Sequence, residues 1–406
     1  MSGIRAWTLE AALAPILSTF LAFTYAIYIL AYPPKHKKTS ILLLALPVTY
    51  AFIHHLDVAP NRNVSDTFGR FLCIWYAHMS YEVVILEFKP PTTKENDGWK
   101  TRVKEAYKVL FDRNHAQVTC SQEEHVKPDT RPGAKKQSHG FSRNRFLRYH
   151  LTKATLLSLA LWVWESYFAD LSFPTTDNSI PFSLRIHTTF DWLFISLILY
   201  DLTHSLFALL FTCLLRFDPP STWSLSLFGP LTAATSVRNY WSNHWHNYIY
   251  HSFSAHAKVL TRGWLGMQRG KWTTRVVENT LVFAASGGMH SAVRWVQEGY
   301  GEGGVWFIAV FYVSQMGAIL VEDVVLRVWR CLKQKAGIRE GESDWWWWWV
   351  NGVERAVGYV WVFGWFMWSV PLYVHTRDAW ADKVVMRKFA ARWEEHLMGE
   401  ARNRED

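Results

Sequence analysis

The chain has 406 residues, half of them apolar, and a formal net charge of +9. Its length allows two or three soluble domains, but the apolar residues gather into blocks long enough to cross a bilayer, which argues against a soluble protein. The basic residues lie between these blocks and no nucleic-acid-binding motif is present. A membrane surface therefore explains the charge, and a nucleic-acid partner is not expected.

The apolar blocks predict an all-α, polytopic membrane bundle of about eight transmembrane helices, with an interfacial amphipathic helix besides the spans. The first block is longer than the apolar core of a signal peptide and follows no strongly basic leader, so we expect it to remain as a span. In chain order, the predicted spans are residues 9–32, 41–56, 71–88, 154–171, 190–215, 276–296, 305–328 and 357–374.

Three regions follow from this pattern. Residues 1–88 hold spans one to three, residues 89–150 form a basic and largely mobile loop, and residues 151–406 form a core with spans four to eight. Within the loop, a helical fragment over residues 99–111 is expected on the membrane surface. The tryptophan run at residues 345–349 is expected in the interfacial aromatic belt, with a substrate-stacking surface as the alternative.

The loops alternate in charge. Those after the odd-numbered spans carry Lys and Arg, whereas those at residues 57–66, 172–187 and 297–304 are nearly neutral or acidic. By the positive-inside rule the basic loops, including residues 89–150, are cytoplasmic, and both termini are lumenal.

Two regions in the second half of the sequence contain candidate catalytic residues. An aromatic-rich stretch ends in Trp245-His246-Asn247, and His290 lies within the apolar block at residues 276–296. An ionisable side chain in hydrocarbon costs several kcal/mol unless it faces a partner or a cavity, so His290 is a functional candidate.

These regions resemble the two signatures of the wax synthase branch of the membrane-bound O-acyltransferases. In that family an aromatic block ends in Trp-His, and an apolar helix carries Ser-Gly-x-x-His. Tyr240 stands where the family usually has Phe, and His251 stands where Arg is common. The residues that carry the resemblance are Trp223, Phe228, Gly229, Ser236, Arg238, Tyr240, Trp241, Trp245, His246 and Ser286-Gly287-Gly288-Met289-His290.

The resemblance implies that residues 151–406 form a wax synthase-like acyltransferase core in an internal membrane such as the endoplasmic reticulum. The co-substrate would be acyl-CoA. Fungal relatives of this type imply acetyl-CoA as the donor and a small lipophilic, terpenoid-like alcohol as the acceptor. A long-chain wax ester synthase remains an alternative, and a membrane transporter or scaffold is the alternative of another class.

Transfer from a thioester to an alcohol needs a base and a group that polarises the carbonyl, and it needs no metal. His290 is the expected base, with Gly287 and Gly288 allowing close approach of substrate or backbone. His246 is expected to polarise the carbonyl and Asn247 to add a hydrogen bond. The alternatives are a structural buried histidine at position 290 and, for the other two, the polar face of an interfacial amphipathic helix over residues 236–259.

Other charged residues have two interpretations. Asp201 and His204 are three residues apart on one helix face and are predicted to pair. The histidines at 246, 251 and 256 are five residues apart, about 140° of rotation on a helix, so they are not expected to share a metal. The residues expected to bind the coenzyme A phosphates, with membrane-surface charge as the alternative, are Arg238, Lys258, Arg262, Arg269 and Lys271.

Overall fold

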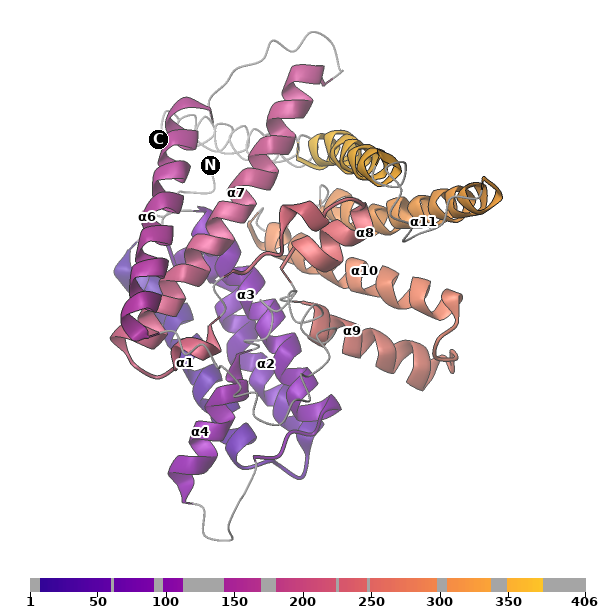
Figure 1. Cartoon of the computed structure of the whole chain (residues 1–406). Helices are drawn as coiled ribbons and strands as arrows, with labels where there is room; N and C mark the ends of the chain where they lie inside the picture. Colours follow the sequence, from indigo (N-terminus) through magenta and orange to yellow (C-terminus); the bar gives the residue numbers. More distant parts are fainter. Residues whose placement is uncertain are drawn as a thin grey trace, which may run out of the picture. The chain divides into compact units, whose positions relative to one another are not determined.

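Every regular element in the described part of this computed structural model is helical (Figure 1). The structure describes residues 8–59, 62–90, 98–111, 142–168, 180–223, 226–246, 249–297, 305–336 and 349–374. The chain divides into two compact units, which are described separately here. Unit 1 comprises Met1–Asp112, Ile249–Met316 and Tyr373–Asp406, and unit 2 comprises Arg113–Tyr248 and Gly317–Leu372.

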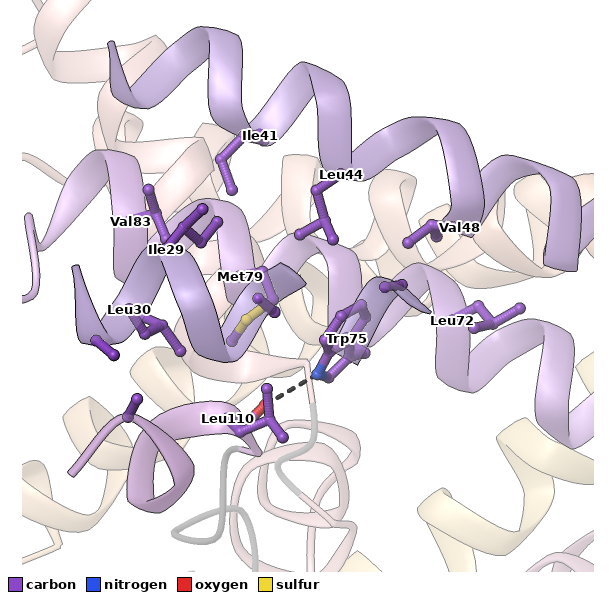
Figure 2. Close-up of a cluster of buried hydrophobic side chains, with 14 of the residues drawn as sticks. Ile29, Leu30, Ile41, Leu44, Val48, Leu72, Trp75, Met79, Val83 and Leu110 are labelled. Atoms are coloured by element: carbon purple, nitrogen blue, oxygen red, sulfur yellow. Dashed lines mark hydrogen bonds between the residues drawn. The ribbon is translucent and has the colours of Figure 1, made fainter. Parts of the chain in front are cut away.

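The N-terminal part of unit 1 is a cluster of helices around an apolar core (Figure 2). Small residues of α1, such as Ala22 and Ala26, are fully buried and let the neighbouring helices approach closely. Trp75 of α3 donates its indole N–H to Leu110 O of α4 (2.9 Å). The helices are α1 (Leu9–Ala31), α2 (Lys37–Ile53), α3 (Arg62–Ser80) with the π-helical turn η2 (Tyr81–Ile85), and α4 (Trp99–Leu110).

The helix expected over residues 99–111 is confirmed as α4, but its surroundings differ from the expectation. Ala106 and Leu110 are buried in the core of unit 1, so protein covers the apolar face that was expected to lie on the membrane. Most of the remaining loop lies outside the described residues.

The rest of unit 1 packs around α10 (Trp272–Gln297). This helix lies against α3 and against α9 (Tyr250–Lys258), which continues as the π-helical turn η8 (Val259–Trp264). Gln297 Nε2 donates to Asp66 Oδ1 (3.1 Å), and Ser80 Oγ lies 3.0 Å from His256 Nε2. The first contact joins α10, the second signature helix, to α3, and the second contact joins α9 to the end of α3.

Unit 2 is built on α6 (Arg143–Tyr167) and α7 (Phe182–Ala208), which extends into the π-helical turn η4 (Leu209–Leu214). Lys153 Nζ of α6 lies 2.7 Å from Asp201 Oδ1 of α7. The sequence predicted His204 as the partner of Asp201, whereas the structure places the cation on the neighbouring helix. The unit also contains residues 317–335 of α11 (Val305–Lys335) and residues 349–372 of the C-terminal helix Trp349–Val374.

Four of the described helices are long and apolar enough to cross a membrane: Leu9–Ala31, Phe182–Leu214, Trp306–Lys335 and Trp349–Val374. The other four predicted spans fall on α2, α3, α6 and α10. Helix α2 has only 17 residues, and α10 carries Arg275, Glu278 and Arg294. The chain is thus a helical protein with membrane-capable helices, and eight spans remain a prediction. Residues 345–348 of the tryptophan run lie outside the described residues.

Candidate active site

The first signature region folds as a compact loop of unit 2. Its helical pieces are η5 (Pro220–Thr222), η6 (Leu231–Ala233), α8 (Val237–Asn239) and the π-helical turn η7 (Tyr240–His244). Ser236 Oγ accepts a hydrogen bond from Asn239 N (3.0 Å) and so caps the start of α8. The helical turn ends at His244 because Trp245 is extended, with φ −71° and ψ 152°.

The continuous amphipathic helix expected over residues 236–259 is therefore interrupted. The physical reason is a pair of hydrogen bonds between two segments of the loop. Gly229 N donates to His244 O (2.9 Å), and His244 Nδ1 donates to Gly229 O (2.8 Å). Tyr240 and Trp245, which lie within residues 236–259, are only 3% and 9% exposed, so protein covers both side chains.

Aromatic side chains surround the Trp-His element. Trp245 stacks on Trp192 of α7, with ring centroids 6.0 Å apart and an interplanar angle of 4°. Tyr240 packs edge-on against Phe366 of the C-terminal helix (4.6 Å). His246 is half-buried, and its ring lies 4.7 Å from that of Tyr200 and 5.8 Å from that of Phe228. The imidazole of His246 therefore lies in a largely aromatic wall.

Glu322 anchors this loop from α11. The carboxylate is 6% exposed and accepts hydrogen bonds from the backbone N–H groups of Val237 and Arg238, the latter at 3.1 Å. It also accepts from Trp361 Nε1 of the C-terminal helix (2.7 Å). Because charge-assisted hydrogen bonds are stronger than neutral ones, one side chain fixes the first turn of α8 to two long helices.

A glycine completes this anchorage. A Cβ on Gly358 would lie 2.2 Å from Thr235 O, so the C-terminal helix approaches the loop more closely than any other residue would allow. Tyr359, the next residue, donates its hydroxyl to Thr232 O (2.9 Å).

The second signature region lies on α10 in unit 1. A Cβ on Gly287 would meet Ala309 Cα of α11 at 2.9 Å, so the two helices touch through their backbones there. One turn later the half-buried His290 ring stacks on Tyr312 of α11, with centroids 4.6 Å apart and planes 12° apart. Gly287 thus has the predicted role of allowing close approach, and Gly288 faces open space.

Two of the five basic residues proposed for coenzyme A are paired with carboxylates. Arg262 donates from Nε and Nη2 to the two oxygens of Glu278, at 2.6 and 3.0 Å. Arg238 Nη2 lies 2.7 Å from Asp323 Oδ2. The other three are in unit 1: Lys258 is half-buried, and Arg269 and Lys271 are exposed. The phosphate-binding role of the set stays a prediction.

His246 belongs to unit 2 and His290 to unit 1, so their meeting in one active site stays a prediction. Asn247 lies outside the described residues. Within the part of the chain that the structure describes, no three His, Cys, Asp or Glu side chains are grouped as metal ligands.

The sequence reasoning missed Glu322 and Tyr312. A signal for Glu322 existed, because a carboxylate within the apolar block at residues 305–328 requires a partner. Tyr312 gave no such signal, since its position against His290 depends on the packing of α10 on α11.

Comparison with known proteins bears on the same residues. Residues 223–313, which include both His246 and His290, match the family model described as Membrane bound O-acyl transferase family. The predicted resemblance to this family is confirmed. The match covers the aromatic loop, α9, α10 and the start of α11.

Curated fungal proteins are also similar to the chain. Acetyltransferase nanB of Aspergillus nanangensis is 30% identical over 38% of this chain and 35% of its own length. Acetyltransferase TRI7 of Fusarium sporotrichioides is 26% identical over 45% and 40%, respectively. Acetyltransferase aurG of Calcarisporium arbuscula is 27% identical over 52% and 47%. The chain therefore matches less than half of the length of each relative.

Proposed function

We propose that the chain is an acyl-CoA-dependent alcohol O-acyltransferase that acetylates a hydroxyl of a lipophilic, terpenoid-like secondary metabolite in the endoplasmic reticulum. The observation that carries the proposal is the family match over residues 223–313, which contains both signature histidines. The acetyltransferase names of the three relatives favour an acetyl donor over a long acyl chain.

In the proposed reaction, His290 takes the proton of the acceptor hydroxyl as its oxygen attacks the thioester carbonyl. His246 and Asn247 donate hydrogen bonds to the oxyanion that forms on the carbonyl oxygen. The carbon–sulfur bond then breaks, and the thiolate of coenzyme A receives the proton from His290. The products are an ester and free coenzyme A.

Two features of α10 support His290 as the base. The stack on Tyr312 fixes the plane of the imidazole, and Gly287 brings the two helices close enough for that stack. The helix is also continuous from Trp272 to Gln297, so His290 lies about 21 Å along it from Val276 at 1.5 Å per residue. An extended pantetheine arm spans roughly that distance from a nucleotide at the surface.

The test is a transfer assay on microsomes that contain the full chain. Labelled acetyl-CoA, decanoyl-CoA and palmitoyl-CoA are each supplied with an extract of lipophilic alcohols, and microsomes from the same host without the chain are the control. We expect ester formation mainly from acetyl-CoA. Esters from palmitoyl-CoA alone would favour a wax ester synthase, and no ester from any donor, despite normal membrane insertion, would contradict an acyltransferase.

A further inference from the structure

His244 presents a buried hydrogen-bond acceptor inside the aromatic loop. A carbonyl oxygen can only accept, so the bond to Gly229 O (2.8 Å) places the proton of the ring on Nδ1. Burial lowers the pKa of His244, although the bonds to backbone carbonyls oppose this, so the neutral ring is favoured. Its Nε2 then carries a lone pair, and this atom has no hydrogen-bond partner among the described residues.

Tyr240 presents the complementary group. Its side chain is 3% exposed, and its phenol oxygen also has no partner within the described ranges. The ring is held by Phe366 (4.6 Å) and Trp245 (5.6 Å). Leaving a buried donor unpaired costs the desolvation of that group, and most buried side-chain polar atoms in proteins have a partner.

The two atoms belong to neighbouring rings of one turn, with centroids 5.4 Å apart. Tyr240 offers an O–H that requires an acceptor, and His244 offers a lone pair that requires a donor. A carbonyl group would satisfy only Tyr240, and an ammonium group would satisfy only His244. A hydroxyl group does both, since its oxygen accepts one bond and its proton donates the other.

We propose that Tyr240 and His244 form a subsite that binds one hydroxyl group, from the acceptor alcohol or from a water molecule, in the same aromatic loop as His246. Phe228 packs against both histidines, at 6.1 Å from the His244 ring and 5.8 Å from the His246 ring. The alcohol source rests on the proposed function, because an acyltransferase of this type must position an acceptor hydroxyl. The subsite itself depends only on the geometry of unit 2.

A double-mutant cycle on the purified full chain in detergent tests the subsite without any turnover. Tyr240→Phe removes one oxygen, and His244→Asn keeps an amide that can donate to Gly229 O while removing Nε2. We expect each variant to lower the thermal midpoint by roughly 1–5 °C and the double variant to lower it by less than the sum, because both lose the same hydroxyl. Tyr167→Phe, which removes an exposed hydroxyl of the same unit outside the aromatic loop, is the control, and we expect it to leave the midpoint unchanged.

A thermal midpoint for Tyr240→Phe equal to or above that of the unmodified chain would overturn the proposal, because deleting an unfilled buried hydroxyl costs nothing. Strictly additive effects of the two substitutions would overturn it as well. Neither readout depends on transferase activity, so failure of the proposed function and failure of the subsite are distinguished.

The source of the hydroxyl is decided by repeating the thermal melts with 1-dodecanol and with dodecane as matched probes. If the acceptor supplies it, dodecanol raises the midpoint of the unmodified chain more than dodecane does, and Tyr240→Phe abolishes the difference. If water supplies it, the two probes act alike while the losses in the single variants persist. Both outcomes support the subsite, and they assign different occupants to it.

Discussion

The contact between α10 and α11 at Gly287 allows a matched pair of substitutions to test the site around His290. A Cβ at Gly287 would lie 2.9 Å from Ala309 Cα and 3.2 Å from Tyr312 Cβ, so α11 must move by about 0.5 Å to reach ordinary contact at 3.4 Å. A Cβ at Gly288 meets no atom within 4 Å. Gly287→Ala therefore forces the helices apart, and Gly288→Ala does not.

The energies follow from this difference. Overpacking costs about 1–3 kcal/mol, whereas either substitution gains up to about 1 kcal/mol in helix propensity. We expect Gly288→Ala to be neutral or slightly stabilising and Gly287→Ala to be about 1–3 kcal/mol less stable than it. The His290 ring stacks on Tyr312 of α11, so a movement of α11 displaces the imidazole. Because a 1 Å misplacement of a catalytic group can cost about 100-fold in rate, we expect Gly287→Ala to lower the transfer rate about tenfold.

The assay compares thermal unfolding in detergent and initial rates of acetyl transfer at equal expression. Equal stability and equal rates for the two variants would refute the close approach of α10 and α11 as a determinant of the site. If only Gly288→Ala lost stability or transfer rate, the face of α10 that determines the site would be the one that carries Gly288 and not the one that carries Gly287.

Three further predictions follow from the site and the loops. His246→Ala is expected to lower the turnover number by roughly 100- to 1,000-fold, with a smaller rise in the acyl-CoA Michaelis constant. His246→Asn is expected to keep part of the activity. A change in the Michaelis constant alone would assign His246 to binding of the acyl donor. Arg262→Ala should lower the thermal midpoint because Glu278 loses its two hydrogen bonds from Arg262 and keeps the one from Thr261. Lys271→Glu should instead raise the acetyl-CoA Michaelis constant with an unchanged midpoint; the reverse pattern would exchange the two roles. Protease treatment of sealed microsomes should cut residues 262–271 and spare residues 297–304, and the opposite pattern would invert the predicted orientation.

The sequence predicted the helical class, the family resemblance and the close approach at Gly287, because each depends on local pattern. It also predicted the helix now seen as α4. Hydropathy could not show that Ala106 and Leu110 of this helix pack into the core of unit 1, since an amphipathic face fits a protein core and a membrane surface equally well.

The errors share a physical cause, which is contact between residues distant in the chain. The helical turn ends at His244 because this residue is hydrogen-bonded to Gly229, 15 residues earlier. Asp201 pairs with Lys153, 48 residues earlier, and the residue pattern within one helix cannot predict a partner on another helix. Gly288 could not be told from Gly287 by type alone, because only the packing of α11 decides which glycine is covered.

The central claim is that His290 is the base of an acyl transfer. Its most direct test is the rate of ester formation from labelled acetyl-CoA by microsomes carrying His290→Ala, with His36→Ala as the control at an exposed histidine of the same unit. We expect His290→Ala to lose a factor of roughly 100 to 10,000 or more while inserting normally, and His36→Ala to keep full activity. Near-normal turnover by a correctly inserted His290→Ala protein would contradict the mechanism.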